Sequence, residues 1–138
     1  MLTRKAPRRF VWAIGLFLLA GCGATFDQAS LENAQSLKSK SMAMMSNAKD
    51  PFNTHEVDVT ILKLDIENAY SHSASLKNNN ESVKIWGIIK DPNGHSFGGF
   101  LTRWQQNNTI SIIMIEQSKA EIAKHYNTLI DNENAKNK

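Results

Sequence analysis

The chain has 138 residues, of which 16 are Lys or Arg, 13 are Asp or Glu and one is Cys. Four basic residues lie within the first nine positions and no acidic residue precedes Asp27, so residues 22–138 carry a net charge of −1. This balance argues against a nucleic-acid partner, which would need a basic face on the folded domain. A single Cys excludes an internal disulfide framework and zinc sites built from several thiolates, and the length favours one small domain.

The first 21 residues have the three-zone layout of a secretory signal peptide. A basic stretch, 1–9, is followed by an apolar run, 10–20, and then by Gly21. As a helix the apolar run would extend only about 17 Å, whereas the hydrocarbon core of a bilayer is about 30 Å thick. We therefore expect residues 1–21 to be a cleaved signal peptide rather than a spanning helix.

The four residues Leu19-Ala20-Gly21-Cys22 resemble the lipobox of bacterial lipoproteins. The resemblance implies cleavage between Gly21 and Cys22 and acylation of the Cys22 thiol by diacylglycerol, with a possible further acyl chain on its new amino group. Two or three acyl chains on one residue would hold the mature protein firmly on the bilayer without crossing it. The alternatives for Cys22 are a free thiol after an ordinary secretory cut and a thiol at the end of a retained anchor helix.

The position after the cysteine is occupied by Gly23. Within the resemblance, Asp at this position is typical of retention at the inner membrane, so Gly indicates an outer-membrane lipoprotein that faces the periplasm. In a host with a single membrane, the same anchor would place the protein on the outer face of the plasma membrane. Residues 22–26 form a short tether that reaches at most about 18 Å, which would keep the domain close to its membrane.

The first predicted helix covers 27–48, because its apolar residues recur at steps of three to five without Gly or Pro. Pro51 interrupts the pattern, and Asn53 with Glu56 three residues later predicts a capped helix start. Apolar residues at helical spacing then predict a second helix over 57–76. Its first third also alternates as Val57, Val59 and Ile61, which would suit a strand, but a run of about 20 residues is too long for one strand here.

Three consecutive Asn residues, 78–80, predict a loop whose last member caps a helix over 81–90. Asp91-Pro92-Asn93-Gly94 predicts a type I turn. The residues around this turn, 83–101, would alternatively form a β-hairpin, although Gly98 and Gly99 would weaken its second strand. A last helix is expected from 109 or 111 to 131, with one apolar stripe formed by Ile112, Ile115, Ile122, Tyr126 and Leu129.

The pattern as a whole predicts an all-α fold: a small bundle of four to five helices over 27–131, followed by a flexible tail, 132–138. An α+β fold with a hairpin at 83–101 is the alternative.

Few residues suggest chemistry. Glu121 and His125 stand four apart on one helix face, where a solvated polar pair is more common than a metal site. Methionines at 42, 44 and 45 are soft ligands that suit Cu(I), but two of them share an apolar stripe and therefore indicate core packing. No nucleophile motif or phosphate-binding loop occurs, and the remaining histidines are scattered: His55, His72 and His95.

Four aromatic residues cluster around the central turn: Trp86, Phe97, Phe100 and Trp104. They form either the core of the bundle or a partly exposed patch that docks a partner protein. We expect a non-enzymatic envelope lipoprotein without a cofactor, bound to the bilayer through acylated Cys22, whose domain binds another envelope protein as an accessory, assembly or inhibitory factor. A small periplasmic hydrolase or metal-binding protein is one alternative, and a structural envelope lipoprotein without a discrete site is the other.

Overall fold

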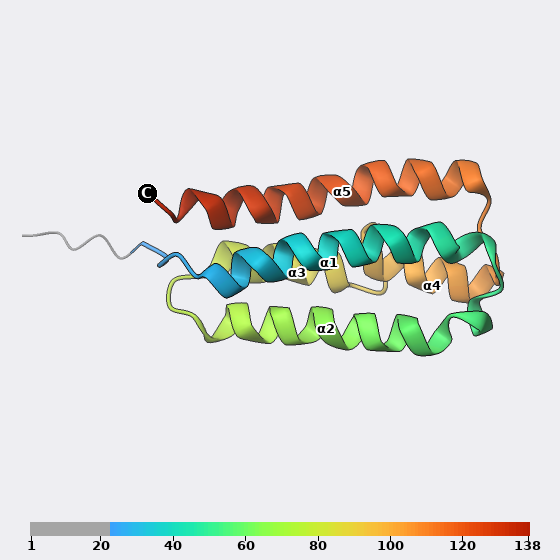
Figure 1. Ribbon diagram of the computed structural model, residues 1–138, viewed down its shortest axis with the longest axis horizontal. Coiled ribbons are helices and arrows are strands. Elements are labelled where there is room, and N and C mark those ends of the chain that lie inside the picture. The colour runs from blue at the N-terminus through green and yellow to red at the C-terminus, as the bar shows by residue number, and fades with distance from the viewer. Residues whose placement is uncertain (1–22) are drawn as a thin grey trace, which may run out of the picture.

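The computed structural model describes residues 23–138, so the predicted signal peptide and Cys22 lie outside the described range (Figure 1). Within residues 23–138 the chain forms helices and no strand, which confirms the predicted all-α bundle and shows that the hairpin alternative at 83–101 is wrong. The helices are α1 (Gln28–Ser46), α2 (Glu56–Ser75), α3 (Asn80–Lys90), α4 (Phe97–Asn107) and α5 (Ile112–Ala135).

The five helices are arranged like a four-helix bundle, because α3 and α4 follow one another and together occupy the position of one long helix (Figure 1). Helices α1 and α3 each pack against both α2 and α5, which places α2 and α5 diagonally across the bundle. One end, here called the tether end, holds residues 23–27, the connection 76–79 and the C-terminus. The opposite end, here called the distal end, holds the connections 47–55 and 108–111.

Side-chain caps stabilise the starts of the first and last helices, α1 and α5. The Asp27 carboxylate accepts a hydrogen bond from the backbone N–H of Ser30 at 2.7 Å, and the Ser111 hydroxyl accepts one from Met114 at 3.3 Å. Each bond satisfies an N–H group that has no partner inside its helix. The predicted start of the last helix at 111 is therefore confirmed, although Ile112, predicted to lie on its buried stripe, is exposed.

The predicted cap at Asn53 is wrong because a tertiary contact determines the local backbone. Phe52 packs edge-on against Trp104 with their ring centroids 5.2 Å apart, and its N–H donates to the backbone oxygen of Asn108 at 2.9 Å. Residues 52–54 consequently form a short 3-10 turn, and α2 begins at Glu56 with His55 in the N-cap position. Similarly, Asn80 lies inside α3 rather than capping it.

Helices α3 and α4 are separated by the predicted turn at residues 91–94. The N–H of Gly94 donates to the backbone oxygen of Asp91 at 3.1 Å, and the N–H of Asn93 donates to the Asp91 carboxylate at 2.9 Å. Helix α4 then passes so close to this turn that a Cβ on Gly98 or Gly99 would overlap backbone oxygens of residues 90–94. The Gly-Gly pair therefore permits the close approach of a helix to a turn.

The last helix runs past its predicted end at 131, because α5 continues to Ala135. Glu133, which lies inside the range predicted to be flexible, is fully buried. Sequence patterning could not anticipate this, because a carboxylate is rarely buried unless a cation pairs with it, and that cation is Lys136 within the same tail.

Two glycines give a matched test of the close approach at the break. Gly99→Ala should lower the free energy of unfolding by about 1–3 kcal/mol, because the new methyl group must displace the backbone of the turn. Gly87→Ala in α3 meets open space and should raise stability by about 0.5–1 kcal/mol, as expected for Ala over Gly in a helix. Thermal or urea denaturation of both variants measures the difference, and equal effects would contradict the packing described for the break.

Candidate functional site

The four aromatic residues proposed as a docking patch lie in the core. Trp86, Phe97, Phe100 and Trp104 are each at most 1% exposed. The Trp104 indole N–H donates to the backbone oxygen of Asp50 at 3.0 Å, which satisfies its polar atom inside the bundle. The prediction that these side chains meet a partner is therefore wrong, since a partner cannot reach a buried ring, and the alternative prediction of a core is confirmed.

Tyr126 of α5 completes this core. Its ring packs edge-on against Trp86 with the ring centroids 6.1 Å apart, and its hydroxyl group shares a 2.7 Å hydrogen bond with the Ser41 hydroxyl. Burial raises the pKa of the Tyr126 phenol, because the phenolate would lose its hydration. The hydroxyl therefore serves as a neutral hydrogen-bonding group that joins α1 to α5.

The candidate metal ligands do not converge. Glu121 pairs with Lys124 on the surface, and that hydrogen bond lowers the pKa of the Glu121 carboxyl, whereas His125 contacts the Ser96 hydroxyl at 2.9 Å. Residues 23–138 contain no group of three His, Cys, Asp or Glu side chains placed to hold a metal ion. Met45 is fully buried and packs in the core with its half-buried neighbours Met42 and Met44.

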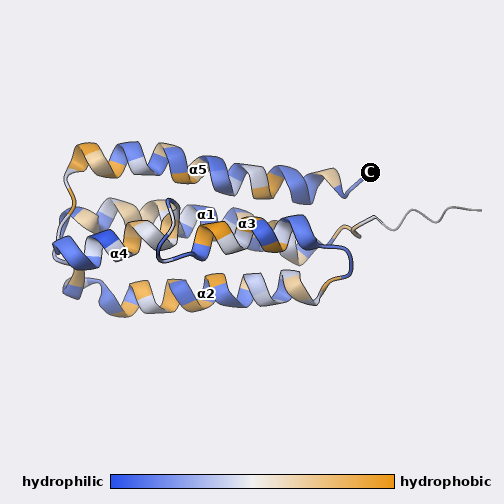
Figure 2. Cartoon of the chain, turned by 180° about the vertical axis from the view of Figure 1, so that it is seen from behind, coloured by the Kyte–Doolittle hydropathy of each residue, from blue (hydrophilic) through white to orange (hydrophobic). Residues whose placement is uncertain are grey.

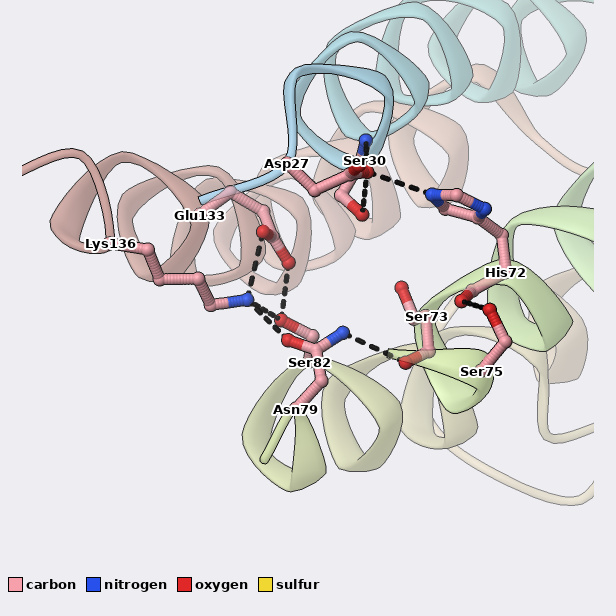
Figure 3. A network of polar contacts seen from close by, with 9 residues as sticks. All are labelled: Asp27, Ser30, His72, Ser73, Ser75, Asn79, Ser82, Glu133 and Lys136. Atoms are coloured by element: carbon pink, nitrogen blue, oxygen red, sulfur yellow. Dashed lines mark hydrogen bonds and ion pairs between the residues drawn. The ribbon is translucent and has the colours of Figure 1, made fainter. Parts of the chain in front are cut away.

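A buried polar cluster closes the tether end of the bundle (Figure 3). The Ser82 hydroxyl donates to the Glu133 carboxylate, and Lys136 donates to the same carboxylate at 2.8 Å and to the Ser82 oxygen at 2.9 Å. Asn79 and Asn132 contribute further hydrogen bonds to Lys136 and Ser82. Because Ser82 and Glu133 are fully buried, a dissolved substrate has no access to them, and the cluster serves to join α3 to α5.

A second polar contact ties the start of α1 to the end of α2. His72 lies with its Nε2 atom 2.7 Å from the carboxylate of Asp27, which is also the cap of α1. The hydrogen bond with His72 lowers the pKa of the Asp27 carboxyl, and the bonds from Ser30 act in the same direction. Residues 23–26, the described part of the predicted tether, therefore lead directly into Asp27, which hydrogen bonds hold to both α1 and α2.

One exposed apolar surface lies on α2, and another lies at the start of α5, where Ile112, Ile113 and Met114 are exposed. Val57, Ile61 and Leu64 are 72%, 54% and 60% exposed, and their spacing of four and three residues places them on one side of the helix. This side, here called the α2 face, points away from the core. Hydrophobic residues accordingly mark the first half of α2 in Figure 2.

A shallow, open groove continues the α2 face toward α1. It has a volume of about 310 Å³, and its apolar lining comes from both helices: Ala43, Met44, Ile61 and Leu62. Charged and polar side chains form its edges: Lys40, Asn47, Asp58 and Asp65. Because Ile61 belongs to both features, the α2 face and this α1–α2 groove make one continuous apolar surface near the distal end. A cavity of about 90 Å³ on the opposite side of α2 is too small for most ligands.

Sequence reasoning missed the α2 face although a signal was present. Val57, Val59 and Ile61 alternate because two helical stripes overlap, one buried and one exposed. Val59 belongs with Leu62 on the core side, whereas Val57 and Ile61 point outward. Helix α2 is therefore apolar on two opposite sides, and the bundle buries only one of them.

A scan against protein-family models and searches of curated proteins and of solved structures found no match to this chain. Among residues 23–138, no helix is both long and apolar enough to span a bilayer.

The buried cluster at the tether end can be tested with two ion pairs of identical spacing. Glu133→Ala should lower the free energy of unfolding by about 3 kcal/mol or more, because it leaves the Lys136 ammonium buried without a counter-ion. Glu121→Ala removes an exposed pair of the same spacing with Lys124 and should leave the stability unchanged. Urea denaturation measures both, and similar losses would show that burial of Glu133 contributes little.

The contact between Asp27 and His72 predicts a pH dependence with a defined sign. The pKa of Asp27 lies below its ordinary value of 3.8 in the folded chain, so the ionised carboxylate stabilises the fold above that pH. This stabilisation is lost as the pH falls through the folded-state pKa. Asp27→Asn, which keeps a capping oxygen, should lower the melting temperature at pH 7, and the difference from the wild type should shrink below pH 3.8. A difference that stays constant with pH would contradict this role.

Proposed function

We propose that this protein is a lipid-anchored bacterial envelope protein whose helical bundle binds another envelope protein, as an accessory, assembly or inhibitory factor. The observation that carries the binding role is the α2 face together with the α1–α2 groove, an apolar surface that the bundle itself leaves open. Covering an exposed Val, Ile or Leu with a partner contributes about 1 kcal/mol or more per side chain. A soluble domain gains nothing from exposing three of them side by side.

The placement of this surface suits an anchored binding protein. The predicted lipid anchor precedes the tether end, whereas Leu64 and Val57 lie about 16 and 27 Å farther along α2, at 1.5 Å per residue from its last residue, Ser75. Acyl chains on Cys22 would hold the tether end at the bilayer. The apolar surface would then face a partner that stands beside the same membrane.

The lipid anchor is tested by replacing Cys22. Cys22→Ser should abolish the incorporation of radiolabelled palmitate and leave an uncleaved or soluble chain, because a hydroxyl cannot form the thioether. Membrane fractionation and labelling of both proteins provide the measurement. Normal lipid labelling of the Ser variant would refute lipidation at this position.

The binding role is tested by native electrophoresis of membranes from cells that express the full chain. The wild type should migrate in a complex larger than the monomer, and the double variant Val57→Ser/Leu64→Ser should shift to the free form. Ile113→Ser, which removes a side chain as exposed as Val57 but on α5, should leave the complex intact. A complex that survives the double variant would exclude the α2 face as the binding surface.

A further inference from the structure

We propose that Asn93, in the turn between α3 and α4, is a site of spontaneous covalent modification. Its side-chain amide is lost as ammonia, and the peptide bond to Gly94 moves to the side-chain carboxyl. This inference is independent of the proposed binding function. It follows from the residue after Asn93, from the exposure of the turn and from the close packing of α4 against it.

The reaction needs only the chain and water. The backbone nitrogen of Gly94 loses its proton to solvent and attacks the side-chain carbonyl carbon of Asn93, and the amide group takes up a proton and leaves as ammonia. The product is a cyclic imide that contains both carbonyl carbons of residue 93. Water then opens the ring. Addition to the backbone carbonyl, the more electrophilic of the two, gives isoaspartate, and addition to the side-chain carbonyl gives ordinary aspartate.

The sequence singles out this position. Asn93 is the only Asn in the chain that is followed by Gly. A side chain on the following residue would crowd the attacking nitrogen, whereas Gly leaves it open and lets the backbone rotate toward the Asn side chain. Asn93 is exposed, so water reaches it and ammonia can leave. Asn108 is the matched comparison, because it is also exposed in a connection but precedes the β-branched Thr109.

The folded turn controls the rate. The N–H of Gly94 donates to the backbone oxygen of Asp91 at 3.1 Å, and the N–H of Asn93 donates to the Asp91 carboxylate at 2.9 Å. The first bond must open before the nitrogen can lose its proton, and the second holds Asn93 within the turn. The reaction therefore proceeds from the opened turn, and a higher pH accelerates it because the deprotonated nitrogen is the nucleophile.

The product would disturb the packing of α4. Isoaspartate adds a carbon atom to the main chain between residues 93 and 94, within the connection from α3 to α4. The backbone oxygen of Gly94 already occupies the space that a Cβ on Gly99 would need. A displaced Gly94 therefore presses against α4, whose aromatic side chains belong to the core. We expect modification of the turn to weaken that core.

The test ages the full chain for several days in nanodiscs of uncharged phosphatidylcholine, at mildly acidic and at mildly alkaline pH. Trypsin then cleaves after Lys90 and Arg103 and releases a peptide in which Asn93 is the only Asn. Mass spectrometry measures the conversion of amide to acid, and electron-transfer fragmentation separates isoaspartate from aspartate. Ageing in water enriched in heavy oxygen labels the product that forms before the digest.

Asn93 should convert several-fold faster than Asn108, mainly to isoaspartate, and faster at alkaline pH. Asn93→Gln should keep its amide, because the longer side chain would have to close a larger ring. Asp91→Ala, which removes an acceptor that holds the turn, should convert faster than the wild type. The aged chain should melt about 4 °C or more below the fresh chain. Asn93→Asp carries the same charge without the added atom and should melt close to the fresh wild type.

Each part of the inference has a result that overturns it. An Asn93 that keeps its amide as long as Asn108 does would refute the modification site. Conversion to ordinary aspartate alone would refute the transfer of the peptide bond. An unchanged rate in Asp91→Ala, shown by circular dichroism to be folded, would refute control by the turn. Aged protein as stable as Asn93→Asp would refute the effect on α4.

Discussion

Burial of the large aromatic rings is the constraint on which the rest of this structure depends. A domain of this size has few positions that enclose such rings fully, yet Trp86, Phe97, Phe100, Trp104 and Tyr126 are all at most 1% exposed. Three of them lie on α4, which follows the break between α3 and α4. The break in turn requires the Gly-Gly pair, since α4 passes against the turn that precedes it.

This use of the aromatic residues determines what remains on the surface. The rings satisfy their polar atoms internally, through Asp50 for Trp104 and Ser41 for Tyr126, and none is left to meet a partner. At the tether end, the buried ion pair between Glu133 and Lys136 stabilises the last turn of α5. Among residues 23–138, the large apolar side chains that remain exposed are consequently aliphatic or methionine, and three of them lie on one side of α2.

The helices could be predicted because the spacing of apolar residues, and the helix-breaking residues between the helices, agree with the observed packing. Contacts between distant residues caused the errors: Phe52 meets Trp104 and displaces the expected cap, and Lys136 allows Glu133 to be buried beyond the predicted end of the domain. The candidate site was misplaced for a related reason. Aromatic side chains suit either a core or an interface, and only the fold decides between them. The α2 face was missed because the alternation of Val57, Val59 and Ile61 was considered only as a possible strand pattern.

The central claim, that the α2 face meets another envelope protein at the membrane, is tested most directly by a photo-reactive amino acid at position 61 of the full chain in living cells. We expect light to join this position to one envelope protein, within a segment that presents apolar side chains to the α2 face. Mass spectrometry of the joined peptides identifies that segment. Cross-links only to lipid or to a second copy of the chain would contradict the claim.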